Sequence, residues 1–381
     1  MKLFVLITFL LTYVLIVSRR KNPTLMPYIG ISVLLLFGAI DFKQALGSIN
    51  FNVLGVFTGT MILSNLFIES GVPAYLAARF VDKSKNVCTA LLSVCCLSAF
   101  ISSFADNVAT VLIVAPIALA IARTLSLNPI PLLIGVALSS NLQGCATMIG
   151  DAPSIILALE SKMTFNDFFW MQGKPGIFFA VELGALASFF VLFLFFRKYK
   201  SAVTKSFSIQ PKTKVPAVLL VLMVLSLAIS SLLPTKPHYI LAFICLFWAA
   251  VGIFWYLVVR KEKIAFTKIL DYRTLVFLIG IFILIGSLTH NGIIDDIAQI
   301  ILSRAAGNAL FAFLMIVWFS VFVSAFVDNI PYTIAMIPVA KIVAGSLGIA
   351  PYPLLFGLLI GTCLGGNITP IGASCNIVAV G

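Results

Sequence analysis

The sequence predicts an all-α polytopic membrane protein that contains two inverted repeats. Hydrophobic residues make up 61% of the 381 residues and charged residues only 10%, a balance typical of helical membrane proteins rather than of soluble domains. Apolar runs follow one another along the whole chain, and two segments that begin 222 residues apart, at Ser102 and Ser324, are closely similar. We expect each repeat to contain a re-entrant helical hairpin and a broken transmembrane helix.

The two similar segments each place an Asp-Asn pair inside an apolar run. SSFADNVATVLIVAPIALAIA begins at Ser102 and SAFVDNIPYTIAMIPVAKIVA begins at Ser324. The same offset aligns a second group of residues, namely Leu142, Gly144, Thr147, Ile149, Gly150 and Ile155 with Leu364, Gly366, Thr369, Ile371, Gly372 and Ile377. Because a carboxylate in a bilayer is costly, two symmetrically placed ones indicate a functional site.

The apolar runs divide the chain into two halves, residues 1–196 and 215–381, joined by a cytoplasmic linker at 197–214. In the first half we expect spans at 3–17, 24–40, 52–68 and 176–196, a hairpin at 86–123 and a broken helix at 130–158. In the second half we expect spans at 215–233, 239–259 and 274–289, a hairpin at 308–347 and a broken helix at 351–380. No partner of the span 176–196 follows, so the sequence is expected to be a fragment that lacks its last span.

The basic residues predict the orientation of these spans. When the linker 197–214 is placed in the cytoplasm and both hairpins return to their starting side, 18 of the 25 Lys and Arg residues lie inside. This bias follows the positive-inside rule and predicts a multi-pass protein of the plasma or inner cell membrane with its N-terminus outside. The net charge of +12 is therefore explained by topology, and no nucleic-acid partner is expected.

Charge counting gives the same sidedness for a re-entrant hairpin and for two full spans. Length favours the re-entrant form, because only about 17 residues lie on either side of each Asp-Asn pair. A re-entrant hairpin brings helix ends with unpaired backbone groups to the middle of the membrane, where they suit ions. Asp106, Asn107, Asp328 and Asn329 are thus candidate ligands for sodium or for protons. The alternative is that each pair only caps the second half-helix.

The expected broken helices interrupt their apolar runs with small and polar residues, as SSNLQGCATMIGDAPS and GTCLGGNITPIGASCN. Such a break must face protein or a water-filled site, since lipid does not satisfy free backbone groups. The candidate binding residues here are Asn141, Thr147, Gly150, Asp151, Asn367, Thr369, Gly372 and Asn376. Asp151 is a candidate proton carrier, because its counterpart is Ala373. Close helix packing through small residues is the alternative explanation.

These motifs resemble the ion transporter superfamily, in particular the branch of arsenite/antimonite permeases, D-type sodium–proton antiporters and the melanosomal P protein. That branch carries S-A-F-x-D-N in each hairpin and G-G-x-x-T-L-I-G in each broken helix. SSFADN and SAFVDN match well, whereas Pro370, Gln143, Ala152 and Ser154 depart from the broken-helix pattern. The resemblance implies a scaffold, a mobile transport domain that moves like an elevator, and often a homodimer. The related dicarboxylate branch has Ser-Asn-Thr at its hairpin tips.

The sequence therefore predicts a secondary active transporter, not an enzyme, that moves a small inorganic ion or oxyanion by proton- or sodium-coupled exchange. The alternatives are a proton- or sodium-coupled citrate or dicarboxylate transporter and, from another class, an ion channel. An intramembrane aspartyl protease is disfavoured because no G-x-G-D string is present. No cofactor is expected beyond the coupling ion. No G-x-x-x-x-G-K-[ST] loop is present, so ATP-driven transport by this chain alone is not expected. A soluble ATPase subunit is compatible with the sequence but is not indicated by it.

Overall fold

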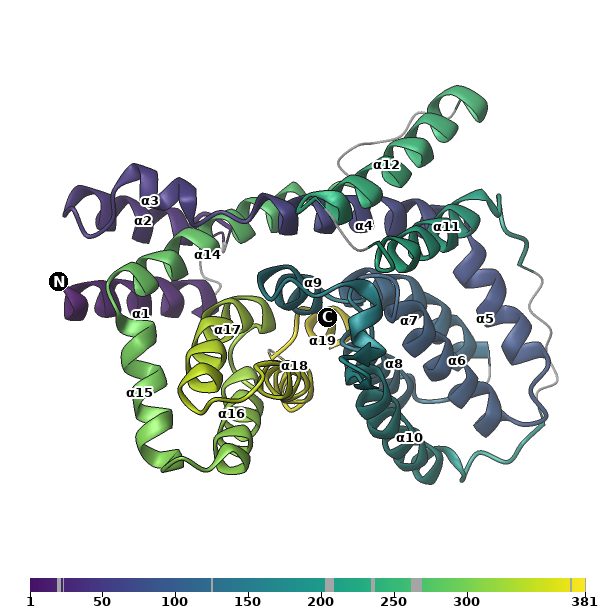
Figure 1. Ribbon diagram of the computed structural model, residues 1–381. Helices are drawn as coiled ribbons and strands as arrows, with labels where there is room; N and C mark the ends of the chain where they lie inside the picture. Colours follow the sequence, from purple (N-terminus) through teal and green to yellow (C-terminus); the bar gives the residue numbers. More distant parts are fainter. Residues whose placement is uncertain are drawn as a thin grey trace.

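The computed structural model describes residues 1–18, 22, 24–124, 126–202, 209–233, 237–261, 269–370 and 372–380. The described chain is almost entirely helical (Figure 1). Its strands are the two-residue β1 (Trp170–Met171) and β2 (Lys174–Pro175), which pair antiparallel. The prediction of an all-α fold is therefore confirmed. Arg19, Arg20 and Lys21, which contribute to the predicted orientation, lie outside the described residues.

The helices of the first half follow the expected apolar runs. They are α1 (Lys2–Ser18), α2 (Met26–Leu36), α3 (Phe42–Gly47), α4 (Phe51–Glu69), α5 (Val72–Asp82), α6 (Val87–Ser102), α7 (Asn107–Thr124), α8 (Ile130–Gly144), α9 (Ala152–Glu160), the short η1 (Phe165–Phe168) and α10 (Ile177–Phe196). Helix α2 ends before the expected residue 40, and Gly38 beyond it has a φ of 65°. That left-handed conformation suits glycine at a helix end.

The second half has a matching series of helices. They are α11 (Val215–Ser230), α12 (Ile240–Phe254) with its extension η2 (Trp255–Val259), α14 (Tyr272–His290), α15 (Ile293–Ala305), α16 (Ala309–Ser324), α17 (Asn329–Ser346), α18 (Tyr352–Gly366) and α19 (Ser374–Val380). From α6 to α8 and from α16 to α18 the helix ends recur near the offset of 222 residues: Asn107 and Asn329 start the second hairpin helices. The inverted orientation of the two series stays a prediction.

Repeated capping residues explain why these helices start where they do. Asn86 caps α6 through the N–H of Thr89 at 2.9 Å, and Asn308 caps α16 through the N–H of Phe311 at 3.1 Å. Side chains of this type accept a hydrogen bond from the otherwise unpaired N–H groups of the first turn. The same local chemistry therefore starts the first helix of each expected hairpin.

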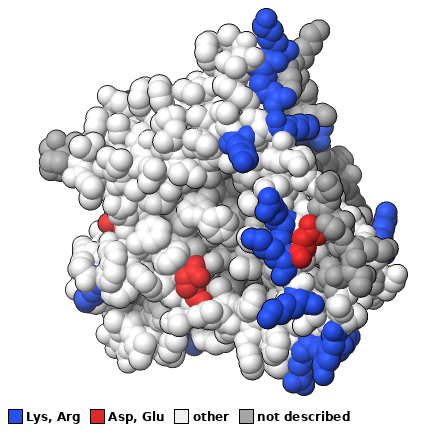
Figure 2. Space-filling model, turned by 90° about the vertical axis from the view of Figure 1, so that its right-hand side faces the viewer, with Lys and Arg blue, Asp and Glu red and all other residues white. Residues whose placement is uncertain are grey.

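Length and exposure agree with a multi-pass membrane protein. Five described helices of 18 to 20 residues are long and apolar enough to cross a membrane, namely α4, α7, α10, α14 and the continuous Ile240–Val259. Because α7 belongs to the first expected hairpin, helix length does not decide between a re-entrant hairpin and two full spans there. Helix α10 exposes large apolar side chains such as Leu183 and Phe195, at 69% and 66%. Figure 2 shows a face that is mostly uncharged, with Lys and Arg gathered in a band along one side. Such a band suits one side of a bilayer.

The two halves pack across each other at the centre of the molecule. Helix α9 from the first half contacts α17 from the second half, and α19 from the second half contacts α7 and α8 from the first. Figure 1 shows α9 and α19 between the group α6–α8 and the group α16–α18, with α4 and α14 running along one side. The tips of both predicted hairpins therefore meet in one region with the two helix breaks, which lie between α8 and α9 and between α18 and α19.

Candidate functional site

Each Asp-Asn pair lies where one hairpin helix ends and the next begins. Asp106 Oδ2 accepts hydrogen bonds from the N–H groups of Val108 and Ala109 at 3.0 and 3.2 Å. Asp328 Oδ1 accepts one from the N–H of Ile330 at 3.1 Å. Both carboxylates therefore cap the second half-helix. Capping occupies only part of their acceptor capacity, since an ionised carboxylate has about four lone-pair positions.

The asparagines of the two pairs support the shape of the tips. The hydroxyl of Ser102 donates to Asn107 Oδ1 at 2.5 Å, and the hydroxyl of Ser324 donates to Asn329 Oδ1 at 2.6 Å. Both asparagines are buried, with 4% and 5% of their surface exposed. The serine that opens each S-x-F-x-D-N string therefore holds the asparagine five residues later, so part of the motif is structural.

Each helix break folds against the tip of the hairpin in the same half of the chain. The hydroxyl of Thr147 donates to the carbonyl of Ser103, and the hydroxyl of Thr369 donates to the carbonyl of Ala325. A side chain ten residues after the end of each first half-helix also crosses the break: Ser154 donates to the Gly144 carbonyl at 3.3 Å, and Asn376 Nδ2 donates to the Gly366 carbonyl at 2.7 Å. These bonds replace backbone partners that the break removes.

Gly150 and Gly372 make the close approach of break and hairpin tip feasible. A Cβ atom on Gly150 would lie 2.6 Å from the Gly144 carbonyl oxygen and 2.7 Å from that of Ser102. One on Gly372 would lie 2.8 Å from the Ser324 oxygen. These separations are shorter than van der Waals contact, and the neighbours are backbone atoms. Glycine is therefore required at both positions by packing.

We predict that Gly372→Ala lowers the stability of the protein by about 1–3 kcal/mol, the usual cost of inserting a methyl group into a packed interior. The matched control is Gly345→Ala in α17, where an added Cβ meets nothing within 4 Å. Thermal unfolding of the purified protein in detergent measures both variants. Equal unfolding temperatures for the two variants would contradict the packing argument.

Asn141 joins the two helix breaks to each other through hydrogen bonds. It is fully buried, and its Nδ2 donates to the Cys363 carbonyl and to Asn367 Oδ1, each at 2.9 Å. Its Oδ1 accepts from Asn107 Nδ2 at 3.2 Å. The first hairpin tip, the first break and the second break thus share one polar network. Such a buried, satisfied network holds these parts rigidly together.

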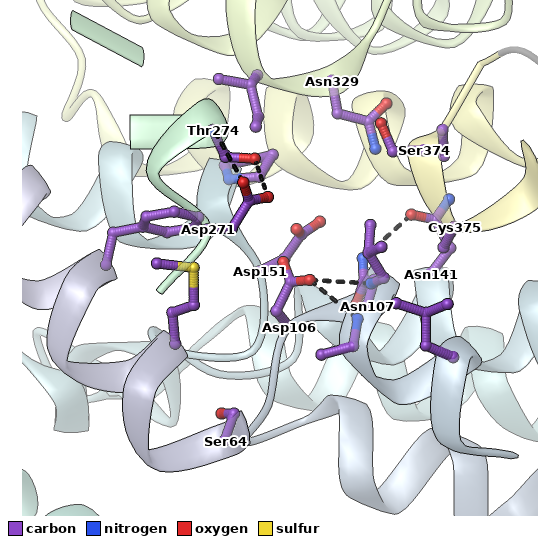
Figure 3. Close-up of a pocket in the computed structure, with 18 of the residues that line it drawn as sticks. Ser64, Asp106, Asn107, Asn141, Asp151, Asp271, Thr274, Asn329, Ser374 and Cys375 are labelled. Atoms are coloured by element: carbon purple, nitrogen blue, oxygen red, sulfur yellow. Dashed lines mark hydrogen bonds between the residues drawn. The ribbon is translucent and has the colours of Figure 1, made fainter. Parts of the chain in front are cut away.

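A cavity of about 400 Å³ opens beside this network (Figure 3). Six of the sequence-predicted residues line it: Asp106, Asn107, Asn141, Asp151, Asp328 and Asn329. The other six predicted residues do not line the cavity but stabilise the helix breaks next to it. They are Thr147, Gly150, Asn367, Thr369, Gly372 and Asn376. The structure therefore separates the candidates into residues that face the cavity and residues that support them.

Asp151 is the most deeply buried carboxylate of the cavity, with 8% of its surface exposed. Its Oδ1 accepts a hydrogen bond from the N–H of Ala152 at 2.8 Å. Its Oδ2 is buried without a hydrogen-bond partner among the described residues. A buried, unpaired carboxylate oxygen is costly unless a proton or a cation neutralises it. Asp151 therefore has the environment expected of a proton or cation carrier.

The structure adds cavity residues that the sequence reasoning missed. Asp271 precedes α14 and accepts from the N–H groups of Arg273 and Thr274 at 3.1 and 3.2 Å. Asp271 lines the same cavity as Asp106 and Asp151, and Figure 3 shows it beside them with its carboxylate bonded to Thr274. Asp271 followed three residues later by Thr274 is readable as a helix start. Nothing in the sequence shows that this start borders the cavity, because α14 lies outside the hairpins and breaks.

The cavity is acidic. Four carboxylates line it, and no Lys, Arg or His is among its described lining residues. No group of three or more His, Cys, Asp or Glu side chains gathers closely enough to hold a metal ion in the described part of the chain. A proton or a single monovalent cation fits such a lining better than a multivalent metal, which requires several clustered charged ligands.

Paired hairpins and broken helices around a polar cavity, in a multi-pass helical fold, are typical of membrane transporters. The sequence matches the citrate transporter (CitMHS) family over residues 13–361, and the chain belongs to that family. It is 27% identical to the 46 kDa membrane protein of Mycobacterium leprae, over 99% of this chain and 90% of that protein. It is 28% identical to an uncharacterized transporter of Mycobacterium tuberculosis, over 98% of this chain and 88% of that protein.

More distant likenesses agree with the resemblance seen in the sequence motifs. The human P protein is 25% identical over 97% of this chain and 54% of the P protein. The crystal structure of the Alcanivorax borkumensis YdaH transporter matches the fold with a TM-score of 0.61 and 14% sequence identity, covering 100% of this chain and 90% of that chain. The expected membership of the ion transporter superfamily, with the P protein among its relatives, is confirmed.

Proposed function

We propose that the protein is a secondary active transporter that binds protons or sodium ions at its acidic cavity and couples their movement to that of a small inorganic ion or oxyanion. The observation that carries this proposal is the position of Asp106 and Asp328 at equivalent hairpin tips, with Asp151 lining the same cavity. Carboxylates in this setting bind cations or carry protons. Among the residues that the structure describes around this cavity, none is Lys, Arg or His.

The sign of the cavity charge favours exchange when the transported ion is itself a cation. Substrate and coupling ion then compete for the same carboxylates, so one leaves as the other binds. For an anion the logic reverses, because a bound cation lowers the repulsion that the anion meets. Exchange therefore suits a cationic substrate, and joint movement suits an oxyanion.

Transport of citrate or another carboxylate is the second candidate, and the family to which the chain belongs favours it. The Asp-Asn pairs at the hairpin tips of this chain differ from the Ser-Asn-Thr tips of the dicarboxylate branch of the superfamily. A channel is the third reading. The closely packed breaks and hairpin tips, joined through Asn141, support a carrier whose parts move as a unit rather than an open pore.

The same packing supports an elevator-type movement. The proposed moving block is α6–α9 with α16–α19, which share the network around Asn141 and the cross-packing of α9 and α19. Helices α4 and α14 line the other wall of the cavity, through residues such as Ser64 and Thr274. We place them in the static scaffold. A homodimer, suggested by the resemblance, is a further expectation of this proposal.

Everted membrane vesicles provide the direct test. The change in lumenal pH is followed after adding sodium chloride, arsenite or citrate separately, with vesicles that lack the protein as control. Saturable proton movement on sodium or arsenite addition supports coupled exchange. Uptake of labelled citrate without that signal favours the carboxylate candidate. Non-saturating, ohmic current in place of either would overturn the carrier proposal in favour of a channel.

A further inference from the structure

A second cavity, of about 240 Å³, lies between α6, α8 and α10. Among the described residues, none lines both this cavity and the acidic one. Its mouth is on the outside of the helix bundle, because the lining residues Cys96, Leu186 and Phe189 are exposed. Helix α10 is long and apolar enough to cross a membrane, so the cavity opens towards lipid.

The cavity coincides with a difference between the two halves of the chain. Gln143 occupies the position that glycine holds in the family pattern and in the second half, where its equivalent is Gly365. A Cβ atom on Gly365 would collide with the backbone carbonyl oxygen of Val321, so α18 packs directly on α16 there. The equivalent of Val321 in the first half is Ala99, which lines the cavity together with Gln143. The cavity is therefore a feature of the first half that glycine packing closes in the second.

Two polar side chains meet in this cavity. Gln143 is 7% exposed, and its Nε2 donates a hydrogen bond to Glu182 Oε1 on α10 at 2.8 Å. Its Oε1 is buried without a hydrogen-bond partner among the described residues. No Lys, Arg or His is among the described lining residues of this cavity. Gln143 and Glu182 thus present an amide oxygen and a carboxylate to one space, and a cationic hydrogen-bond donor satisfies both acceptors.

We propose that this cavity binds an organic amine in its protonated form, with the ammonium group on Gln143 Oε1 and Glu182 and the apolar body of the amine against the remaining wall. An ammonium group carries up to three N–H donors and no acceptor, which matches the two oxygens. The wall beside them is apolar, formed by residues such as Leu142, Ala185 and Phe189. Sites of this kind combine an apolar lining with a few placed polar groups.

A bare metal ion fits this lining less well. Metal ions with oxygen ligands take about six or more of them, and no group of three or more His, Cys, Asp or Glu side chains that could hold a metal ion occurs in the described part of the chain. An amine needs fewer polar partners because its carbon skeleton fills the rest of the space. The site stands apart from the acidic cavity, so amine binding does not require coupled transport.

Binding of adamantylamine to the purified full-length chain in detergent tests the proposal by isothermal titration calorimetry. Adamantanol is the matched ligand control, because it has the same apolar cage with a neutral hydroxyl in place of the ammonium group. We expect saturable binding of the amine and binding of the alcohol that is weaker by roughly tenfold or more, the loss typical of a charged hydrogen-bonded group.

Variants locate the site. Glu182→Gln keeps an oxygen that can accept from Gln143 but removes the charge, and it should weaken the amine roughly tenfold or more. Gln143→Met keeps the length of the side chain without its amide and should weaken the amine about fivefold, the equivalent of one neutral hydrogen bond. Glu69→Gln removes a half-exposed carboxylate at the end of α4 and should leave the affinity unchanged. Asp106→Asn, in the acidic cavity, should leave it unchanged as well.

Several outcomes would overturn the proposal. They are the absence of saturable amine binding to the wild type, equal affinity for the alcohol, and equal behaviour of Glu182→Gln and Glu69→Gln. Weaker binding in Asp106→Asn but not in Glu182→Gln would place the amine in the acidic cavity and refute the site described here. If Glu182→Gln does not yield folded protein, Gln143→Met and the alcohol decide between these outcomes.

Discussion

Replacing Asp106 or Asp328 by asparagine is expected to abolish coupled transport, with a loss of at least about 100-fold in each single variant. The charge of a carboxylate that binds a cation in a poorly solvated site contributes several kcal/mol, and a factor of ten corresponds to about 1.4 kcal/mol. Asparagine keeps the oxygen that caps the half-helix, which Asp106 uses towards Val108 and Ala109. Asparagine is also a good capping residue. The variants should therefore fold and insert normally.

Asp41→Asn is the matched control for this experiment. Asp41 also caps a helix, accepting from the N–H of Gln44 at 2.6 Å, but it is exposed and is not among the cavity-lining residues. Its replacement should leave transport unchanged. The measurement is proton or sodium flux in reconstituted vesicles at matched protein content. Normal coupled transport in both tip variants would show that the two Asp-Asn pairs are capping features only.

The hairpin tips and breaks were predictable because one set of physical constraints acts twice in the sequence. Three kinds of position restrict the residue type in both halves of the chain. They are a buried carboxylate, a glycine packed against backbone carbonyls, and a polar side chain that bridges a helix break. Gly150 and Gly372 meet equivalent carbonyl groups, and Thr147 and Thr369 donate to equivalent ones. Constraints of this kind are visible as a repeat without any knowledge of the fold.

The other wall of the cavity was not predictable in the same way. Asp271 and Thr274 begin an ordinary apolar helix, and their sequence explains them fully as a cap and the residue that it binds. They border the cavity only because α14 packs beside the second hairpin helix. A contribution that arises from tertiary packing leaves no periodic signal. The sequence therefore indicated the hairpin tips and helix breaks that border the cavity but not the residues of α14 on its other wall.

The contact between moving block and scaffold gives the second prediction of large effect. At the start of α4, Asn50 Nδ2 donates to Glu160 Oε1 at 2.7 Å, and Glu160 is the last residue of α9. The ammonium group of Lys341 on α17 donates to the backbone carbonyl of the same Glu160. One residue of the proposed moving block thus contacts both the scaffold and its own block.

Cross-linking tests separately whether α9 moves relative to α4 and whether α9 and α17 move together. In a background in which the exposed Cys96 is replaced by serine, a short bis-thiosulfonate cross-linker, which forms reducible disulfides, joins Asn50→Cys to Glu160→Cys, or Lys341→Cys to Glu160→Cys. If α9 slides past α4, the first cross-link should stop transport almost completely, and reductant should restore it. The second cross-link joins two elements that move together, so transport should continue at the rate of the uncross-linked double variant.

The comparison within each double variant, before and after cross-linking, removes the effect of the substitutions themselves. Loss of the Lys341 bond lowers activity in both states of its variant, whereas a mechanical block appears only after cross-linking. Undiminished transport with Asn50 and Glu160 joined would place α9 in the static part and refute the proposed elevator block. A block by both cross-links would mean that α9 and α17 move relative to each other, so that the two halves of the network around Asn141 separate during transport.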